Sequence, residues 1–483
     1  MKKGTYAIIT FGCQMNARDS EKIAGTLESL GYEETGDEQS ADIVFFNTCT
    51  IRENANEHLY GRLGRLKASK KNDPDKIIIL AGCMMQETDE VELIRKKYPY
   101  VDIIMGTHNQ FTLKELLDDL FKKRKGEFKK LNPTHNEVLL SSDPDVEKAA
   151  RLQRYGASSE KDLEKLKRRP VVSLWSDTKD IVEDVPNKRK YPFKQGVNIM
   201  YGCNNFCSYC IVPYVRGREK SREPEEIFRE IRGLAADGVK EIMLLGQNVN
   251  SYARIPFPKL LKQVDDLCDG TSIERIRFMT SHPKDLSEDL CRVIAEGKHI
   301  CHQFHLPLQS GSDAVLLRMN RHYNKEGFLS RARMLREYVP DMSFSTDIIV
   351  GFPGETEEDF LETVDVCEKV RFDAAYTFIY SRRTGTPASA FPDQVPEGVI
   401  KDRFDRLLSV QNRIVEENLA ALKGKTMPVL FEEVSGIDNS LISGRTESNI
   451  IVHVPGTGEL IGSIRDVTLT ESKGFYYMGV LHG

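Results

Sequence analysis

Three cysteines lie close together in the segment YGCNNFCSYCIVPY (201–214). Cys203, Cys207 and Cys210 follow the spacing C-x3-C-x2-C. Thiolates are soft ligands that select zinc, copper or iron–sulfur centres, and a structural zinc site needs four ligands. No histidine or further cysteine between residues 187 and 254 supplies a local fourth ligand. The spacing favours a 4Fe–4S cluster with one iron open to a substrate or cofactor. Zinc with a distant fourth ligand and three merely buried cysteines are the alternatives.

A second set of cysteines is dispersed in the sequence but shares one context. Cys13, Cys49 and Cys83 each end a predicted strand, in TYAIITFGC, DIVFFNTC and KIIILAGC. Because the carboxyl ends of parallel strands lie side by side, these three residues can converge at one sheet edge. The alternative is that each is simply a small buried hydrophobic residue.

The other four of the ten cysteines share no such context, and we expect them to be packing residues: Cys268, Cys291, Cys301 and Cys367. The N-terminal segment MKKGTYAIITFGCQMN predicts a first strand rather than a secretory signal. We therefore expect a cytoplasmic protein whose thiols are reduced, not a disulfide scaffold.

The elements that must position these cysteines alternate between strand and helix. Apolar runs predict strands at 5–11, 41–48, 76–82 and 101–106, with a helix over 19–30. This pattern predicts a parallel α/β domain over residues 1–121. Repeated strand–helix units over 190–415 predict a TIM-type, partial β/α barrel, with strands at 241–245, 275–278, 305–308, 344–351 and 374–380.

The alternation of predicted strands and helices stops between these two domains and gives way to short strands after them. Residues 122–189 contain basic runs and predict a basic linker, with one helix near 145–167 and no assigned role. Short strands and Gly-rich turns over 424–483 predict a small all-β barrel. The predicted fold class is therefore α/β with a C-terminal β-barrel.

Composition limits the function classes. The chain has 483 residues, of which 40% are hydrophobic and 29% charged, as in ordinary globular proteins. No run of about eighteen apolar residues predicts a membrane span. The net charge of −5 excludes a globally basic nucleic-acid binder but not a local basic patch. One such patch, VRGREKSR (215–222), follows the clustered cysteines and predicts either a phosphate grip or a solvated loop.

The clustered motif, with Tyr209 before its last cysteine, resembles the signature of radical S-adenosylmethionine (SAM) enzymes. In that superfamily the open iron binds SAM, and the reduced cluster cleaves SAM to a 5′-deoxyadenosyl radical. FGCQMNARDSE, NTC and AGC resemble the N-terminal domain of methylthiotransferases, which implies a second 4Fe–4S cluster on Cys13, Cys49 and Cys83. The resemblance also implies SAM neighbours in this motif and in three further segments: Tyr209, Gln247, Asn248, Gln309, Ser310 and Asp347.

The branch of the family implied by FGCQMN and by residues 201–222 modifies tRNA. Its reaction converts N6-isopentenyladenosine beside the anticodon to the 2-methylthio derivative, by inserting sulfur at adenine C2 and methylating it. The implied partners are the tRNA anticodon stem-loop, an electron donor of flavodoxin or ferredoxin type and an unspecified sulfur source. Sibling reactions on N6-threonylcarbamoyladenosine in tRNA or on an aspartate of a ribosomal protein are alternatives, and a non-enzymatic iron–sulfur scaffold is a more distant one.

The C-terminal segment resembles the TRAM domain, a small β-barrel linked to RNA binding. Between Gly424 and Gly483 four Lys/Arg face seven Asp/Glu, which gives this domain a net charge of −3. If it contacts RNA, we expect the contact to depend on a local patch around Arg445 or on exposed aromatic rings.

Overall fold

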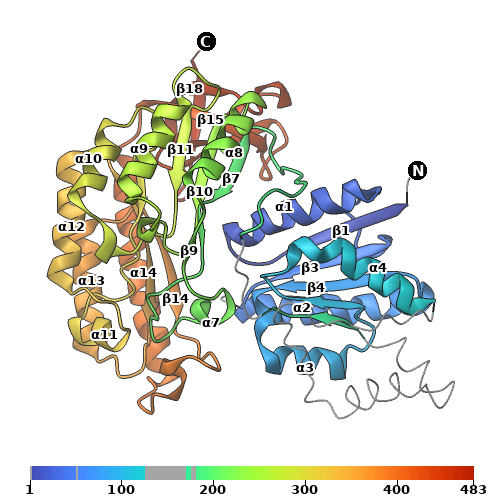
Figure 1. Ribbon diagram of the computed structural model, residues 1–483. Helices are drawn as coiled ribbons and strands as arrows, with labels where there is room; N and C mark the ends of the chain where they lie inside the picture. The colour runs from blue at the N-terminus through green and yellow to red at the C-terminus, as the bar shows by residue number, and fades with distance from the viewer. Residues whose placement is uncertain (1–2, 51–52, 126–169, 176–180, 483) are drawn as a thin grey trace. The chain divides into compact units, whose positions relative to one another are not determined.

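The computed structural model describes residues 3–50, 53–125, 170–175 and 181–482, and these form two compact units (Figure 1). The first unit comprises residues 1–189 together with Ile211–Arg218. The second comprises Lys190–Cys210 and Glu219–Gly483. The predicted helix near 145–167 lies outside the described residues.

The first unit is built on a parallel sheet of six strands in the order β2-β1-β3-β4-β5-β6. The strands are β1 Gly4–Thr10, β2 Tyr32–Glu34, β3 Ile43–Thr48, β4 Ile77–Gly82, β5 Ile103–Met105 and β6 Val171–Ser173. The two central strands, β3 and β4, are buried along their whole length. Their continuous apolar sequences reflect helices on both faces of the sheet.

Two helices pack on each face of this sheet. The helical segments are α1 Gln14–Ser29, α2 Glu53–Asn72, η1 Cys83–Gln86, α3 Thr88–Lys97, η2 Gln110–Thr112, α4 Leu113–Arg124 and the short α7 Val212–Val215. Helices α1 and α4 share one hydrophobic core with alternate residues of the strands, and α2 and α3 share the other. Figure 1 shows α1 and α3 on opposite sides of the strands.

The second unit contains two parallel three-stranded sheets, in the orders β11-β10-β7 and β12-β13-β14. A parallel bridge between Ile276 and Ile300 links them, which gives the predicted partial barrel. The strands are β7 Lys194–Asn198, β10 Glu241–Leu245, β11 Arg275–Phe278, β12 Gln303–His305, β13 Ser343–Val350 and β14 Ala374–Ile379. A small antiparallel pair, β8 Met200–Tyr201 and β9 Lys220–Ser221, follows β7.

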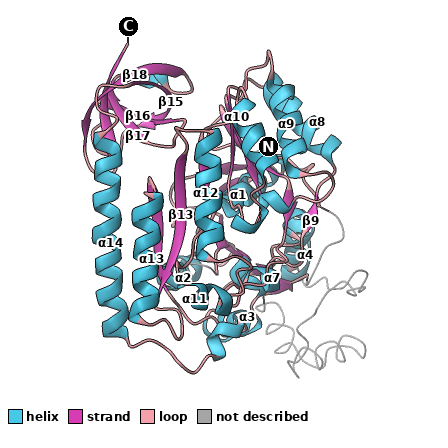
Figure 2. Cartoon of the chain, turned by 90° about the vertical axis from the view of Figure 1, so that its left-hand side faces the viewer, coloured by secondary structure: helices cyan, strands magenta, loops and turns pink. Residues whose placement is uncertain are grey.

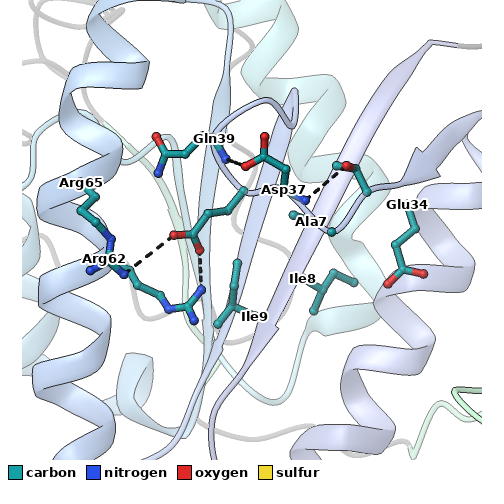
Figure 3. A pocket seen from close by; sticks show the side chains of 11 residues that line it. Ala7, Ile8, Ile9, Glu34, Asp37, Gln39, Arg62 and Arg65 are labelled. Carbon is teal, nitrogen blue, oxygen red and sulfur yellow. Dashed lines mark hydrogen bonds and ion pairs between the residues drawn. The ribbon is translucent and has the colours of Figure 1, made fainter. Parts of the chain in front are cut away.

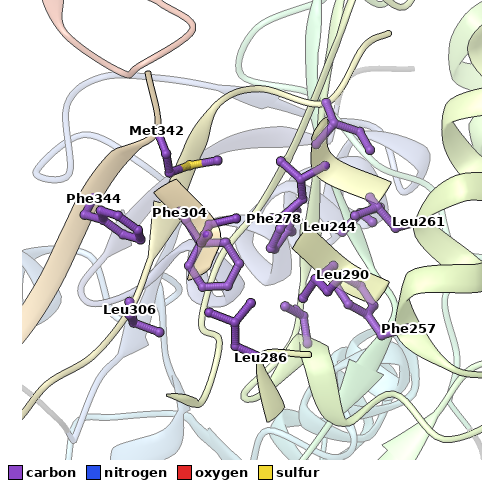
Figure 4. Packing of buried hydrophobic residues seen from close by; sticks show 14 of the residues in the cluster. Leu244, Phe257, Leu261, Phe278, Leu286, Leu290, Phe304, Leu306, Met342 and Phe344 are labelled. Atoms are coloured by element: carbon purple, nitrogen blue, oxygen red, sulfur yellow. The ribbon is translucent and has the colours of Figure 1, made fainter. Parts of the chain in front are cut away.

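The helices of this unit cover the outer face of the strands. They are α8 Pro224–Ala236, α9 Phe257–Cys268, α10 Glu288–Glu296, α11 Asp313–Arg318, α12 Lys325–Tyr338, α13 Glu357–Val370 and α14 Glu397–Ala420, with short turns η3 Val249–Ser251, η4 Pro283–Asp285 and η5 Pro387–Ala390. The core between strands and helices is rich in aromatic rings (Figure 4). The Phe278 ring lies edge-on to Phe257 and Phe304, with centroids 5.4 and 5.5 Å away. This packing fixes the strand ends that carry the site.

The C-terminal residues form a closed five-stranded barrel in the order β15-β16-β17-β19-β18. Its elements are β15 Thr426–Val434, β16 Leu441–Thr446, β17 Ile451–Pro455, η6 Gly458–Leu460, β18 Ile464–Ser472 and β19 Tyr476–Leu481. Figure 2 shows these strands at one end of β13, with α11 toward the other end.

Two arginine side chains of β11 fasten this barrel. Arg275 donates to the backbone oxygens of Pro428 and Arg445, at 2.8 and 2.9 Å. Arg277 donates to the backbone oxygens of Thr446 and Glu447, at 2.8 and 2.6 Å. Arg275 begins β11, in register with the first residues of β10 and β7. The barrel therefore sits at the end opposite to the strand termini where such folds carry their active sites.

Two details differ from the sequence expectations. The strand expected at 305–308 lies earlier, at Gln303–His305, because Pro307 has no N–H to donate to a ladder. The stretch expected to be linker contributes β6, which extends the first sheet by pairing with β5. Among the described residues, no helix has the length and apolar character needed to cross a membrane.

Candidate active site

The clustered cysteines occupy a loop that follows β7 and β8 at the carboxyl end of the partial barrel. Cys203 and Cys207 are buried and Cys210 is half-buried. The loop turns through positive φ at Gly202 and Phe206, of 74° and 47°. The backbone N–H of Cys210 donates to the Cys207 carbonyl at 2.9 Å, which closes the turn.

Other segments of the second unit hold this loop in place. Ser208 donates from its N–H to Met319 O at 3.0 Å and from its hydroxyl to Arg318 O at 2.8 Å. The Asn320 amide donates to the backbone oxygens of Asn205 and Phe206. The sulfurs are therefore positioned by the fold before any ligand binds, as a metal centre requires.

Burial controls the charge of the Cys203 thiol. It raises the pKa of Cys203 to about 11, and the neighbouring Cys207 contributes a smaller rise. The Cys203 thiol is therefore protonated near neutral pH in the chain alone, and a metal centre must displace that proton when it binds.

The dispersed cysteines end three adjacent strands of the first sheet, as predicted. Cys13 follows β1, Cys49 follows β3 and Cys83 follows β4, in a sheet where β1 pairs with β3 and β3 with β4. Cys49 and Cys83 are buried and Cys13 is exposed. Burial raises the pKa of Cys83 to about 12; Arg216 opposes this rise, and Cys49 and Cys13 add smaller rises.

Two glycines and an asparagine allow the three strand ends to lie close together. Gly12 and Gly82 have φ of 118° and 101°, and a side chain on Gly12 would come within 2.6 Å of the Cys49 Cβ. The Asn16 amide donates to the carbonyls of Phe11 and Thr48, both at 2.9 Å. The strand ends and the start of α1 are thereby tied together around the three sulfurs.

Of the residues expected near SAM, Tyr209 belongs to the second unit's loop itself, and the others fall into two groups around it. Gln247 accepts a hydrogen bond from the N–H of Gly202, beside Cys203. Asn248 is buried and donates to Asp285 at 2.9 Å, while its own Oδ1 has no partner among the described residues. A buried acceptor without a donor can take a hydrogen bond from a ligand or a water molecule.

The second group lies where β13 approaches the loop after β12. The N–H of Gln309 donates to Asp347 O at 2.8 Å, and Gln309 has a φ of 65°. Asp347 extends toward His305, with 3.5 Å between Oδ2 and Nε2. The Ser310 hydroxyl instead faces Thr363 of α13, at 3.4 Å, which is a structural contact.

The inner face of the β12-β13-β14 sheet is polar and open, unlike its packed outer face. Alternation along the strands and the pairing of Asp347 with Tyr376 place His305, Asp347, Tyr376 and Phe378 on this face. The rings of His305 and Tyr376 have centroids 6.1 Å apart, and Tyr376 and Phe378 are exposed. The face offers exposed rings beside hydrogen-bonding groups, which suits a flat heteroaromatic substrate.

Comparison with known proteins agrees with this geometry. Residues 197–367 match the radical SAM superfamily, residues 5–106 match the uncharacterized protein family UPF0004, and residues 420–481 match the TRAM domain. The tRNA-2-methylthio-N(6)-dimethylallyladenosine synthase of Lachnoclostridium phytofermentans is 49% identical over 98% of this chain and 95% of its own length. The enzyme of the same name from Thermoanaerobacter pseudethanolicus is 46% identical over 99% of this chain and 92% of its own length.

The chain belongs to the radical SAM methylthiotransferase family. Among solved structures, the radical SAM methyltransferase TsrM from Kitasatospora setae has a TM-score of 0.53 at 15% identity, covering 80% of this chain and 77% of its own. The radical SAM enzyme OxsB has a TM-score of 0.50 at 14% identity, covering 86% of this chain and 56% of its own. These two likenesses concern the fold alone.

The basic stretch 215–222 of this methylthiotransferase does not present all of its cations as a phosphate-binding surface. Arg216 and Arg222 are both buried, and Arg222 pairs with Glu230 at 2.7 Å. Arg216 packs against the dispersed cysteine set. Sequence reasoning missed this placement because a charged run normally indicates a solvated surface.

The four remaining cysteines are buried packing residues, with burial raising each pKa: Cys268, Cys291, Cys301 and Cys367. A separate pocket in the first unit is lined by β1, the 34–39 loop and α2 (Figure 3). Its two arginines, Arg62 and Arg65, share the single carboxylate of Glu38, at 2.5 and 4.0 Å. None of the predicted site residues lines this pocket.

Proposed function

We propose that this chain converts N6-isopentenyladenosine beside the tRNA anticodon to its 2-methylthio derivative. The observation that carries the proposal is the pair of three-cysteine sets in a chain that matches enzymes of that name along almost its whole length. The anticodon stem-loop is then the RNA partner, and the cytoplasm, where tRNA acts, is the place of reaction. An electron donor of flavodoxin or ferredoxin type and a sulfur source complete the partners.

We propose two 4Fe–4S clusters, one on Cys13, Cys49 and Cys83 and one on Cys203, Cys207 and Cys210. Across the described ranges, no three His, Cys, Asp or Glu side chains gather around a single-ion site. A cube binds each thiolate at a different iron, so its ligands need not crowd around one point, and three thiolates leave one iron open. The chemistry that the clusters would supply is reductive cleavage of SAM and delivery of sulfur.

The chain's own residues would bind and orient the reactants. The loop around Cys203 and the unpartnered acceptor of Asn248 support SAM binding at the carboxyl end of the partial barrel. The exposed Tyr376 and Phe378 rings support stacking of a splayed-out base, and an anticodon-loop base is accessible at modest cost. Hydrophobic rings also suit the apolar isopentenyl group.

The C-terminal barrel would contribute to RNA binding through a restricted surface. Arg445, expected as the centre of a basic patch, lies 3.6 Å from the Glu432 carboxylate and also donates to Asn449. Phe475, at the β18–β19 turn, is 76% exposed. Stacking on this ring therefore accounts for an RNA contact better than charge does.

The test measures tRNA nucleosides by mass spectrometry in cells that lack the gene and in cells complemented with variants. Wild-type protein should restore 2-methylthio-N6-isopentenyladenosine and should hold about eight irons after anaerobic reconstitution. Cys203→Ala should abolish SAM cleavage, whereas Cys13→Ala should retain cleavage and abolish sulfur insertion. Cys291→Ala, a buried cysteine outside both sets, is the matched control and should retain both activities.

Several outcomes would contradict the proposal. Unchanged 2-methylthio adenosines in the deletion strain would overturn the tRNA assignment. Loss of the 2-methylthio form of N6-threonylcarbamoyladenosine, or a ribosomal protein lighter by one methylthio group, would assign the chain to a sibling reaction. Full methylthiolation by Cys13→Ala would remove the second cluster from the mechanism.

A further inference from the structure

One fully buried guanidinium contacts a sulfur of the dispersed cysteine set. Arg216, which follows α7, has a side chain that is 5% exposed. Its Nε donates to Cys83 Sγ at 3.2 Å. The same guanidinium donates to Asn16 Oδ1 at 2.8 Å and lies 3.2 Å from the Asp19 carboxylate. Asn16 also accepts from the Cys13 thiol at 3.7 Å, so Arg216 belongs to the network that surrounds two of the three cysteines.

A second buried guanidinium has the equivalent position at the clustered set. Arg321, just beyond α11, is 4% exposed. Its NH1 lies 3.3 Å from Cys207 Sγ, its NH2 donates to Pro307 O at 3.2 Å, and its Nε donates to the Tyr323 hydroxyl at 3.1 Å. Among the described residues, no carboxylate forms an ion pair with this guanidinium.

A buried charge without a counter-ion is costly, because the low-dielectric interior replaces its hydration poorly. Arginine cannot lose its proton to avoid this cost. Neutral oxygens satisfy part of the hydrogen bonding of Arg321, but they do not compensate its charge. Cysteine sulfurs acquire negative charge when a cluster binds, and the sulfur of Cys207 is in hydrogen-bonding contact with Arg321.

We propose that Arg216 and Arg321 are dedicated partners of the two clusters, each donating an N–H to one ligating thiolate. Arg321, which has no carboxylate partner among the described residues, also compensates the charge of its cluster. The inference rests on the proposed function, because it requires both clusters. Three thiolates outweigh the charge of the oxidised core, and reduction adds one electron and therefore a further negative charge. Net charge and hydrogen bonds to sulfur set the reduction potential of such a cluster, so each arginine favours the reduced form of its own cluster.

The test is a reductive titration of reconstituted full-length protein with dithionite, without SAM, followed by electron paramagnetic resonance. Two parent variants isolate the clusters: Cys203, Cys207 and Cys210 all replaced by Ala, or Cys13, Cys49 and Cys83 all replaced by Ala. In the first parent Arg216→Gln should lower the ratio of reduced to oxidised cluster at a fixed potential at least tenfold, which is a shift of about 59 mV for one electron. In the second parent Arg321→Gln should have the same effect.

The lysine variants separate charge from geometry. Arg216→Lys and Arg321→Lys keep the cation but lose the planar fork, so each should shift its cluster's potential less than the glutamine variant does. Arg403→Gln is the control for removing a buried guanidinium: Arg403 is equally buried but pairs with Glu355 at 3.0 Å. It should leave both potentials unchanged.

The outcomes distinguish this inference from the proposed function. Wild-type protein that fails to hold about eight irons would refute the two-cluster proposal on which the inference depends. The wild type could hold both clusters while the Arg→Gln and Arg→Lys variants keep full iron and the wild-type potential. That result would overturn the role of the arginines and leave the two-cluster proposal intact. A shift of both clusters by Arg403→Gln would likewise overturn it, because the effect would then be general. If a glutamine variant loses iron, the reduction potential of the corresponding lysine variant decides whether the arginine acts on its cluster.

Discussion

At the residue scale, the site formed by Cys13, Cys49 and Cys83 depends on the buried strand before each cysteine as much as on the cysteines themselves. The sequence predicted all three strand-end positions, because buried apolar runs end visibly at FGC, NTC and AGC. It did not predict the arginine partners, since a charge in a basic run carries no mark of burial. Arg216 and Arg321 reach their sulfurs from positions 133 and 114 residues away along the chain. Only the tertiary fold brings such pairs together.

Gly82 offers a test at this scale. Its φ of 101° is strained for any other residue, and a Cβ would overlap the Thr48 carbonyl oxygen. Gly82→Ala should destabilise the first unit by about 1–3 kcal/mol and displace Cys83, so reconstituted protein should lose the iron of the dispersed set while SAM cleavage persists. Iron analysis and urea unfolding measure both effects. Gly64→Ala on α2, where a Cβ meets nothing within 4 Å, is the control and should retain all iron.

At the element scale, the long strands were predictable and the short ones were not. The runs at 344–351 and 374–380 correspond closely to β13 and β14, because eight or six apolar-rich residues leave a clear pattern. The three-residue β6 depends on pairing with β5, whose partner positions lie far away in sequence. The strand at 305–308 was predicted too late because the apolar HLPL run continues beyond the last paired residue.

The junction of β13, α13 and α14 gives a pH-dependent prediction. Burial raises the pKa of Glu355 to about 7, although the Gly351 N–H and Arg403 oppose this rise. The folded state therefore binds this proton more tightly than the unfolded state, where the pKa is 4.5. The stability that Glu355 contributes is full below the unfolded pKa and is lost as pH rises through the folded pKa.

The measurement compares the free energy of unfolding of wild type and Glu355→Gln across pH. The difference in favour of wild type should fall from about pH 5 to about pH 8 and then stay level. Asp402→Asn, at an exposed carboxylate on α14, is the control and should show no such fall. A constant difference for Glu355→Gln across this range would mean that the carboxyl titrates normally.

At the scale of the whole molecule, the sequence located a C-terminal β-barrel but could not say how it is attached. The attachment uses charged residues that begin strands of the partial barrel, where sequence patterns predict only solvent exposure. Glu241 is the centre of this junction: its carboxylate lies 3.0 Å from Arg277 and 3.1 Å from Lys194. Lys194 also pairs with Glu432 of β15 at 2.7 Å. The barrel is therefore docked by a buried ionic network at the end opposite to the cysteine loop.

Because of this arrangement, replacing Arg277 should weaken the attachment of the C-terminal barrel while SAM cleavage is retained. Arg277→Met removes two hydrogen bonds to the barrel backbone and leaves Glu241 with less compensation, and breaking a buried pair of this kind costs about 3 kcal/mol. Limited proteolysis should then cut faster in residues 421–425, between α14 and β15, and tRNA should bind more weakly. SAM cleavage should persist, because the cysteine loop lies at the other strand ends. Arg406→Met, at a half-exposed pair with Glu357, is the matched control. Equal protease resistance of Arg277→Met and wild type would show that the apolar contacts of the barrel, not this network, hold it in place.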